Sequence, residues 1–186
     1  MLFRSDKIIV VAADCTGHGV PGAFMSMLGV SFFNEIVNTM EHLQANLILN
    51  RMRDYVKKTL YQRGEDDEAK DGMDLALCII DKKQMKLQYA GAYNSLYYFR
   101  EGEFHQIKAD RMPIGVHVVE KDSFTNHELD LQKDDIFYIF SDGYVDQFGG
   151  KKGSKFKSKP FKRLLTKIHK EPIEEQKEIL ESTLEE

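Results

Sequence analysis

Two apolar segments of the sequence each run into an aspartate, and this repeated pattern constrains the fold more than any other feature. Residues 8–13 (IIVVAA) precede Asp14, and residues 136–140 (IFYIF) lead through one serine to Asp142. Segments so rich in β-branched and aromatic residues are typical of strands buried in a core. The pattern therefore predicts two core strands, each ending at a carboxylate and followed by a glycine whose backbone can adopt unusual conformations. The glycines that follow are Gly17 and Gly143.

The paired carboxylates indicate a divalent cation. Burying an unpaired carboxylate is unfavourable, but two carboxylates from one core are tolerated when a cation lies between them. Carboxylate oxygens are hard ligands, which favour Mg²⁺ or Mn²⁺ over Zn²⁺. Either aspartate alone is better explained as a turn residue or a helix N-cap. Because Asp14 and Asp142 both follow core strands, the pair favours the metal hypothesis.

The rest of the sequence divides into helical and strand-like blocks. Apolar residues repeat with helical spacing over residues 22–40 and 45–62, around residues 161–168 and after Pro172. The predicted strands cover residues 74–80, 85–90, 95–99, 103–107, 124–131 and 135–140. Because the helices are grouped apart from strands joined by short turns, the predicted fold class is α+β, with helices packed outside the sheets.

The first two predicted helices differ in polarity. The helix over residues 22–40 is apolar around most of its circumference, and such a helix is expected to be buried. Its apolar residues are Phe24, Met25, Met27, Leu28, Phe32, Phe33 and Ile36. The helix over residues 45–62 is amphipathic, and its basic residues are expected to face water. These are Arg51, Arg53, Lys57 and Lys58.

Length, charge and cysteine usage narrow the class of protein. A chain of 186 residues is one domain long, and its formal charge of −4 gives no bulk attraction for nucleic acid. Cys15 and Cys78 lack CxxC spacing and follow no signal peptide, so they are expected to be free thiols in a reducing compartment. We expect a cytoplasmic domain without direct membrane insertion, within a parent protein that could itself be membrane-tethered.

Five segments, in order, resemble one enzyme family. DCTGHGVPGAFMSM, DGMDLALCIID, AGAYNSLYYFR, MPIGV and SDGYVDQFGG are similar to motifs of the PPM-type (2C-like) protein serine/threonine phosphatases. The resemblance is to the bacterial branch of stage II sporulation protein E and the RsbU-like regulators. It implies a single domain over residues 1–186, folded as an α-β-β-α sandwich of two antiparallel sheets flanked by helices.

The resemblance also implies a chemistry. Asp14 matches an aspartate that bridges two Mn²⁺ or Mg²⁺ ions, Cys15 the position whose backbone carbonyl helps to hold one ion, and Asp142 a further metal ligand. A water shared between the metals would attack the phosphorus of a phosphoserine or phosphothreonine, with no phosphoenzyme. The implied substrate is a phosphorylated signalling protein of the anti-anti-sigma type.

Other residues near these motifs have two explanations each. Thr16, Gly17, His18 and Gly19 precede a helix N-terminus, which suits a phosphate, but capping and loop ordering explain them equally well. A second group of residues could orient the metal ligands without binding the metal, or could simply form turns and strand ends. These residues are Asp71, Asp74, Gly143 and Asp146. The lysines from Lys151 to Lys159 could recruit an acidic partner, although a solvated loop is the plainer explanation.

The family pattern is incomplete in this sequence. The family's two further aspartates, in a Gly-Gly-Asp motif before residue 7 and in an acidic pair after the last helix, have no counterpart here. The expectation is a domain incomplete at both ends that lacks terminal strands, has doubtful metal occupancy and is weakly active or inactive. Its open sheet edges would favour a homodimer or strand exchange. Two other hypotheses stay open: a non-catalytic interaction module with this fold, and a different metal-dependent hydrolase.

Overall fold

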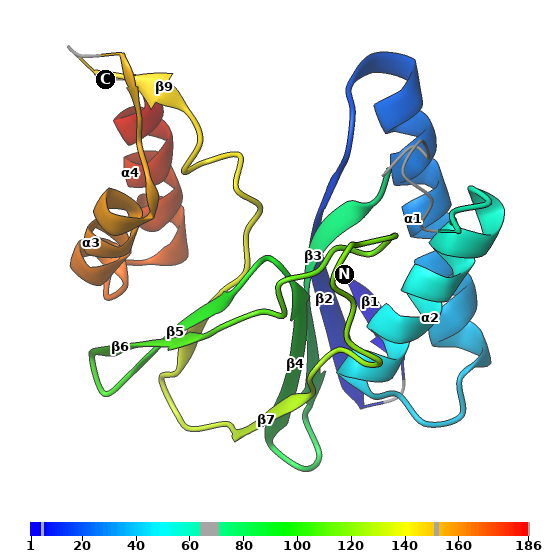
Figure 1. Cartoon of the computed structure of the whole chain (residues 1–186). Coiled ribbons are helices and arrows are strands. Elements are labelled where there is room, and N and C mark those ends of the chain that lie inside the picture. Colours follow the sequence, from blue (N-terminus) through cyan, green and yellow to red (C-terminus); the bar gives the residue numbers. More distant parts are fainter. Residues whose placement is uncertain (5, 64–70, 151–152, 186) are drawn as a thin grey trace.

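The computed structural model describes residues 1–4, 6–63, 71–150 and 153–185, and its strands form two main antiparallel sheets (Figure 1). The first sheet has the order β1-β2-β3-β4-β7 and the second β6-β5-β8. The first comprises β1 (Leu2–Arg4), β2 (Lys7–Cys15), β3 (Met73–Asp81), β4 (Lys86–Ala92) and β7 (His127–Asp130). The second comprises β5 (Leu96–Arg100), β6 (Glu103–Ile107) and β8 (Ile136–Tyr138).

Within the described ranges, four helices cover the outer faces of these sheets. On the first sheet lie α1 (Gly19–Thr39) and α2 (Ala45–Thr59), and on the second lie α3 (Ser158–Ile168) and α4 (Ile173–Glu185) (Figure 1). The two sheets bury a core between them that includes Cys78 and Tyr89 from one sheet and Leu96 from the other. The predicted α-β-β-α sandwich is therefore confirmed, as is the α+β class.

The central strand β3 shows how the sequence produces these layers. Alternate side chains of a strand point to opposite faces. Leu75, Leu77 and Ile79 accordingly join the core under α1 and α2, whereas Ala76 and Cys78 join the core between the sheets. Because both faces are covered, β3 is apolar at nearly every position.

The prediction that the first helix is buried, rather than packed against the core by one face only, is wrong. Met25 and Ile36 are buried against the sheet, but Val20, Phe24 and Met27 are exposed at 70%, 63% and 70%. The helix lies in an outer layer, so the sheet and α2 cover one side of it only (Figure 1). Among the described helices, α1 is long and apolar enough to cross a bilayer by length and composition, a test that core helices also pass.

Two strand features were not predicted from the sequence. Residues before the first predicted strand form β1, which pairs with Lys7–Ile9 only, so β2 has no described partner on that side from Val10 to Cys15. The basic stretch after Asp142 was expected to be a solvated loop. Part of it instead forms β10 (Ser154–Lys155), which pairs with β9 (Phe148–Gly149), and Lys159 lies in the first turn of α3; Lys151 and Lys152 lie outside the described residues.

Candidate functional site

Three carboxylates converge at one end of the sandwich. Asp14, near the end of β2, is in register with Asp74, near the start of β3. Asp142 follows β8 of the other sheet, and its carboxyl group lies near enough to that of Asp14 for the Asp14 charge to raise the pKa of Asp142. The two aspartates singled out from the sequence therefore lie near each other in space, although they are 128 residues apart in the chain.

The electrostatics of these groups reflect their mutual repulsion. Burial raises the pKa of Asp74 to about 6, with further contributions from the charges of Asp142 and Asp14. Burial likewise raises the pKa of Asp142, helped by the charges of Asp14 and Asp146. The charges of Asp14 and Asp142 disfavour ionisation of Asp74, and a bound cation would relieve that repulsion.

The loop after Asp14 is shaped by close backbone contacts. Gly17 has a φ of +86°, which favours glycine. A Cβ on Gly22 would lie 2.8 Å from the Gly17 carbonyl oxygen, so the loop packs directly on the first turn of α1. The hydroxyl of Thr16 donates to the Asp71 carboxylate at 3.1 Å and accepts from the Gly72 N–H at 2.9 Å. Thr16 and Asp71 thus anchor the loop to the start of β3.

The N-terminus of α1 is open to an anion. His18 is its N-cap residue, is exposed and makes no side-chain cap hydrogen bond, and the first turn contains no acidic residue. Free N–H groups at a helix start attract phosphate. Gly19, with a φ of +61°, lets the chain enter the helix from this loop.

The turn that carries Asp142 is compact. The Asp146 N–H donates to the Asp142 carbonyl at 2.9 Å, and the Gly143 N–H contacts the Ser141 hydroxyl at 3.4 Å. Asp146 itself forms an ion pair with Lys155 at 2.6 Å. Lys155 belongs to the basic stretch noted in the sequence, but its pairing with Asp146 was not predicted, because a lysine nine positions away gives no periodic signal.

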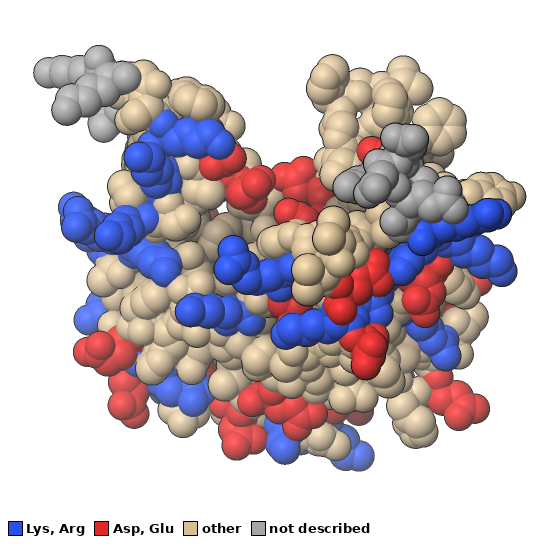
Figure 2. Space-filling view, in the orientation of Figure 1, with Lys and Arg blue, Asp and Glu red and all other residues tan. Residues whose placement is uncertain are grey.

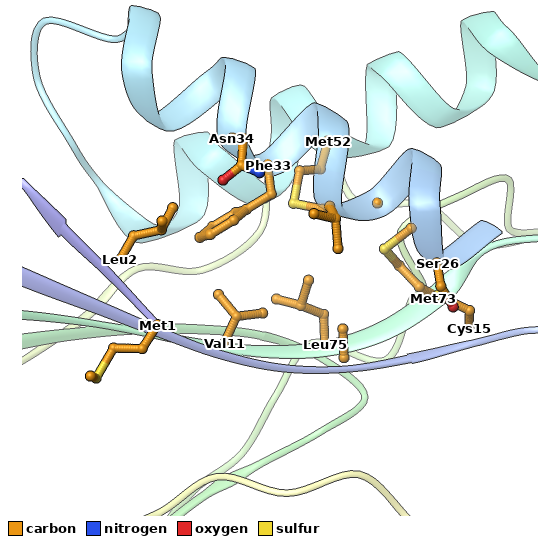
Figure 3. Close-up of a pocket in the computed structure, with 13 residues that line it drawn as sticks. Met1, Leu2, Val11, Cys15, Ser26, Phe33, Asn34, Met52, Met73 and Leu75 are labelled. Atoms are coloured by element: carbon orange, nitrogen blue, oxygen red, sulfur yellow. The ribbon is translucent and has the colours of Figure 1, made fainter. Parts of the chain in front are cut away.

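A cavity of about 440 Å³ lies behind the loop, between α1 and the first sheet (Figure 3). Cys15 lines it together with Val11, Met73 and Leu75, and apolar side chains dominate its walls. The thiol of Cys15 therefore belongs to this apolar cavity, and only the Cys15 backbone remains as the donor that the family resemblance proposes.

The donor set fits a hard cation in chemistry but is not a complete cage. Asp14, Asp74 and Asp142 offer oxygen ligands only, as Mg²⁺ and Mn²⁺ prefer. Within the described ranges, however, no three His, Cys, Asp or Glu side chains are arranged closely enough to hold one ion. Figure 2 shows acidic side chains in a hollow between two projections, one over α1 and one over β9. The site is thus open to solvent.

Comparison with known proteins identifies similar sequences and structures. The sequence matches the family model described as stage II sporulation protein E (SpoIIE) over residues 4–186. The SiaA-PP2C domain of Pseudomonas aeruginosa is 30% identical with a TM-score of 0.86, and the match covers 98% of this chain and 70% of that chain. None of the curated proteins matches the sequence significantly.

Two further structures share the fold at lower identity. The PP2C phosphatase domain, with a regulatory-domain fragment, of SpoIIE from Bacillus subtilis is 17% identical, with a TM-score of 0.74 and coverage of 99% of this chain and 51% of that chain. The RsbU and RsbW domains of Rv1364c from Mycobacterium tuberculosis are 19% identical, with a TM-score of 0.71 and coverage of 97% and 48%. The chain spans about half the length of these two structures.

Proposed function

The chain belongs to the SpoIIE family of PPM-type (PP2C) phosphatases, and we propose that it is a metal-dependent domain that hydrolyses phosphoserine or phosphothreonine on a signalling protein. The proposal depends on one observation above all, the convergence of Asp14 and Asp142 from the two sheets, near enough for their charges to interact. The proposed substrate is a regulator of the anti-anti-sigma type. The pairing of RsbU and RsbW domains in one similar structure supports a protein partner of this kind.

The proposed cofactor is Mn²⁺ or Mg²⁺, held by Asp14, Asp142 and the Cys15 carbonyl, with Asp74 beside them. When bound, such an ion supplies Lewis-acid charge and an acidified water. The chain's own residues then have separate tasks. The Asp14 and Asp142 carboxylates fix the position of the cation, and Thr16 holds the loop against β3. The uncapped start of α1 supports phosphate binding next to that loop.

An alternative function is supported by a different observation. No described group of three acidic, histidine or cysteine side chains is preorganised for a metal. A domain with the fold but without a complete metal site would act as a non-catalytic interaction module. The two functions differ in whether the purified chain turns over a phosphoester.

A phosphatase assay with and without metal tests the proposal. We expect Mn²⁺ to support release of phosphate from a phosphoserine peptide, and a chelator to abolish it. Asp142→Asn is expected to lower turnover by at least about a hundredfold, because it removes a charged ligand. Asp130→Asn, whose side chain is 84% exposed on β7, is the matched control and is expected to keep full activity.

Three results of this assay would contradict the proposal or favour another function. Full activity in the Asp142→Asn protein would refute the role of this convergence. No turnover of any phosphoester, with or without added Mn²⁺, would favour the interaction module. Turnover of p-nitrophenyl phosphate but no phosphopeptide would favour a different metal-dependent hydrolase.

A further inference from the structure

The β9–β10 hairpin is folded back onto the turn that carries Asp142. The Lys157 N–H donates to the Val145 carbonyl at 2.7 Å, and the Phe156 N–H donates to the Gln147 carbonyl at 2.9 Å. These bonds run on from β10, so the basic segment is held along the turn by its backbone. The backbone of Lys155 and Lys157 is consequently held beside the turn that carries Asp142.

One of these lysines is directed at the turn itself. The ammonium of Lys155 lies 2.6 Å from a carboxylate oxygen of Asp146. The same ammonium lies 5.8 Å from the centre of the Phe148 ring, in the geometry of a cation–π contact. Both contacts orient the lysine toward Asp146, which is one turn of backbone beyond Asp142.

Asp146 is the acidic residue that could otherwise join the carboxylate cluster. Its N–H is bonded to the Asp142 carbonyl, so its side chain starts close to that of Asp142. We propose that Lys155 is a positioning residue that withholds Asp146 from the cation site by pairing with it. Only Asp142 of this turn then faces Asp14. This inference rests on the proposed function only in requiring that the site binds a divalent cation.

The ion pair has little role in overall stability. Both side chains are almost half exposed, at 44% for Lys155 and 47% for Asp146. Exposed pairs of this kind contribute little to the free energy of unfolding. A change at Lys155 should therefore alter metal binding without a comparable change in thermal stability, which separates a positioning role from a structural one.

Metal binding to lysine variants tests the inference directly. Titration calorimetry with Mn²⁺ and no substrate is expected to show affinity raised about three- to tenfold in Lys155→Ala, because a positive charge leaves and Asp146 becomes available. Lys155→Arg keeps the pair and is expected to stay within about twofold of the wild type. Lys159→Ala, an exposed lysine on α3, is the matched control.

A second substitution shows whether the effect acts through Asp146. In the Lys155→Ala background, Asp146→Asn is expected to remove the gain in affinity. In the wild-type background it is expected to change affinity by less than about threefold, because the Asp146 carboxylate is paired with Lys155 and does not bind the cation. A tenfold or larger loss in the single Asp146→Asn variant would make Asp146 a metal ligand and overturn the inference.

The remaining outcomes separate this inference from the proposed function. Unchanged or weaker Mn²⁺ binding in Lys155→Ala refutes the role of Lys155, even if the wild type is an active phosphatase. Mn²⁺ binding in the expected order without any phosphatase activity refutes the proposed function and supports the role of Lys155. If no variant binds Mn²⁺, the inference is wrong, and the phosphatase assay alone decides the function.

Discussion

Asp14 and Asp74 face each other across neighbouring antiparallel strands, each one residue from the end of its strand. This register places two carboxylates on the same face, within the distance at which cross-strand side chains interact. Their repulsion is part of the reason that the pKa of Asp74 is raised to about 6. The carboxylates of the site therefore repel one another, and binding of a cation or a proton reduces this repulsion.

The first prediction concerns Asp74 and pH. A carboxyl whose pKa is higher in the folded than in the unfolded protein favours folding when protonated, so stability falls as pH rises from about 4 to about 6. Asp74→Asn removes this loss. In chelator, we expect it to raise the free energy of unfolding near pH 7.5 by roughly 1 kcal/mol, a value discounted for partial exposure.

Urea denaturation at two pH values measures this difference. Near pH 4.5 the gain is expected to shrink by more than half, because most Asp74 carboxyls are already protonated in the folded protein. Asp130→Asn, at a side chain that is 84% exposed, should show no pH-dependent gain. A variant that is less stable than the wild type near pH 7.5 would contradict the prediction.

The convergence of Asp14 and Asp142 could be anticipated from the sequence, because each lies beyond an apolar core strand. The sequence indicated less clearly that Asp74 lies beside Asp14, because the register between two strands depends on tertiary structure. The exposure of Phe24 and the partner of Lys155 could not be predicted. Helical periodicity shows that a face is apolar but not what covers it, and an ion pair across a hairpin depends on the turn geometry.

The second prediction concerns Arg53, which sequence periodicity placed toward water but the structure buries. Its guanidinium donates to the Lys121 and Asp122 carbonyls at 2.9 and 2.8 Å and lies 5.3 Å from the Phe124 ring centre. Arg53→Met keeps the length and leaves two carbonyls without their charged donor. We expect the free energy of unfolding to fall by about 2–4 kcal/mol.

Arg51→Met on the same helix is the control, because Arg51 is exposed. Hydrogen exchange should show faster opening around Asp122 in the Arg53 variant only. Equal stability of the two variants would mean that the buried guanidinium does not hold the segment after residue 120.

The third prediction concerns Gly22, against which the loop after Asp14 packs. The Cβ of an alanine here would lie 2.8 Å from the Gly17 carbonyl oxygen and 3.0 Å from its carbon, and both are backbone atoms that a side-chain rotation cannot move. We expect Gly22→Ala to lower the free energy of unfolding by about 1–3 kcal/mol. Because the loop must shift, Mn²⁺ affinity should fall as well.

Gly149→Ala is the control, because a Cβ there meets nothing within 4 Å. Thermal unfolding and calorimetric Mn²⁺ titration of both variants measure the two effects. Wild-type stability and metal affinity in Gly22→Ala would show that the loop adapts without cost.

The last prediction concerns the open edge of β2. From Val10 to Cys15 this strand is paired with β3 but has no described partner on its other side. Unpaired strand edges join other chains unless a charge or a bulge blocks them. We expect the mass measured by sedimentation to rise with concentration, and Ala13→Lys to suppress the rise by placing a charge on that edge.

Ala23→Lys, at an exposed position on α1, is the control and should leave association unchanged. A constant monomer mass in the wild type, or equal suppression by both lysines, would exclude the β2 edge as the contact.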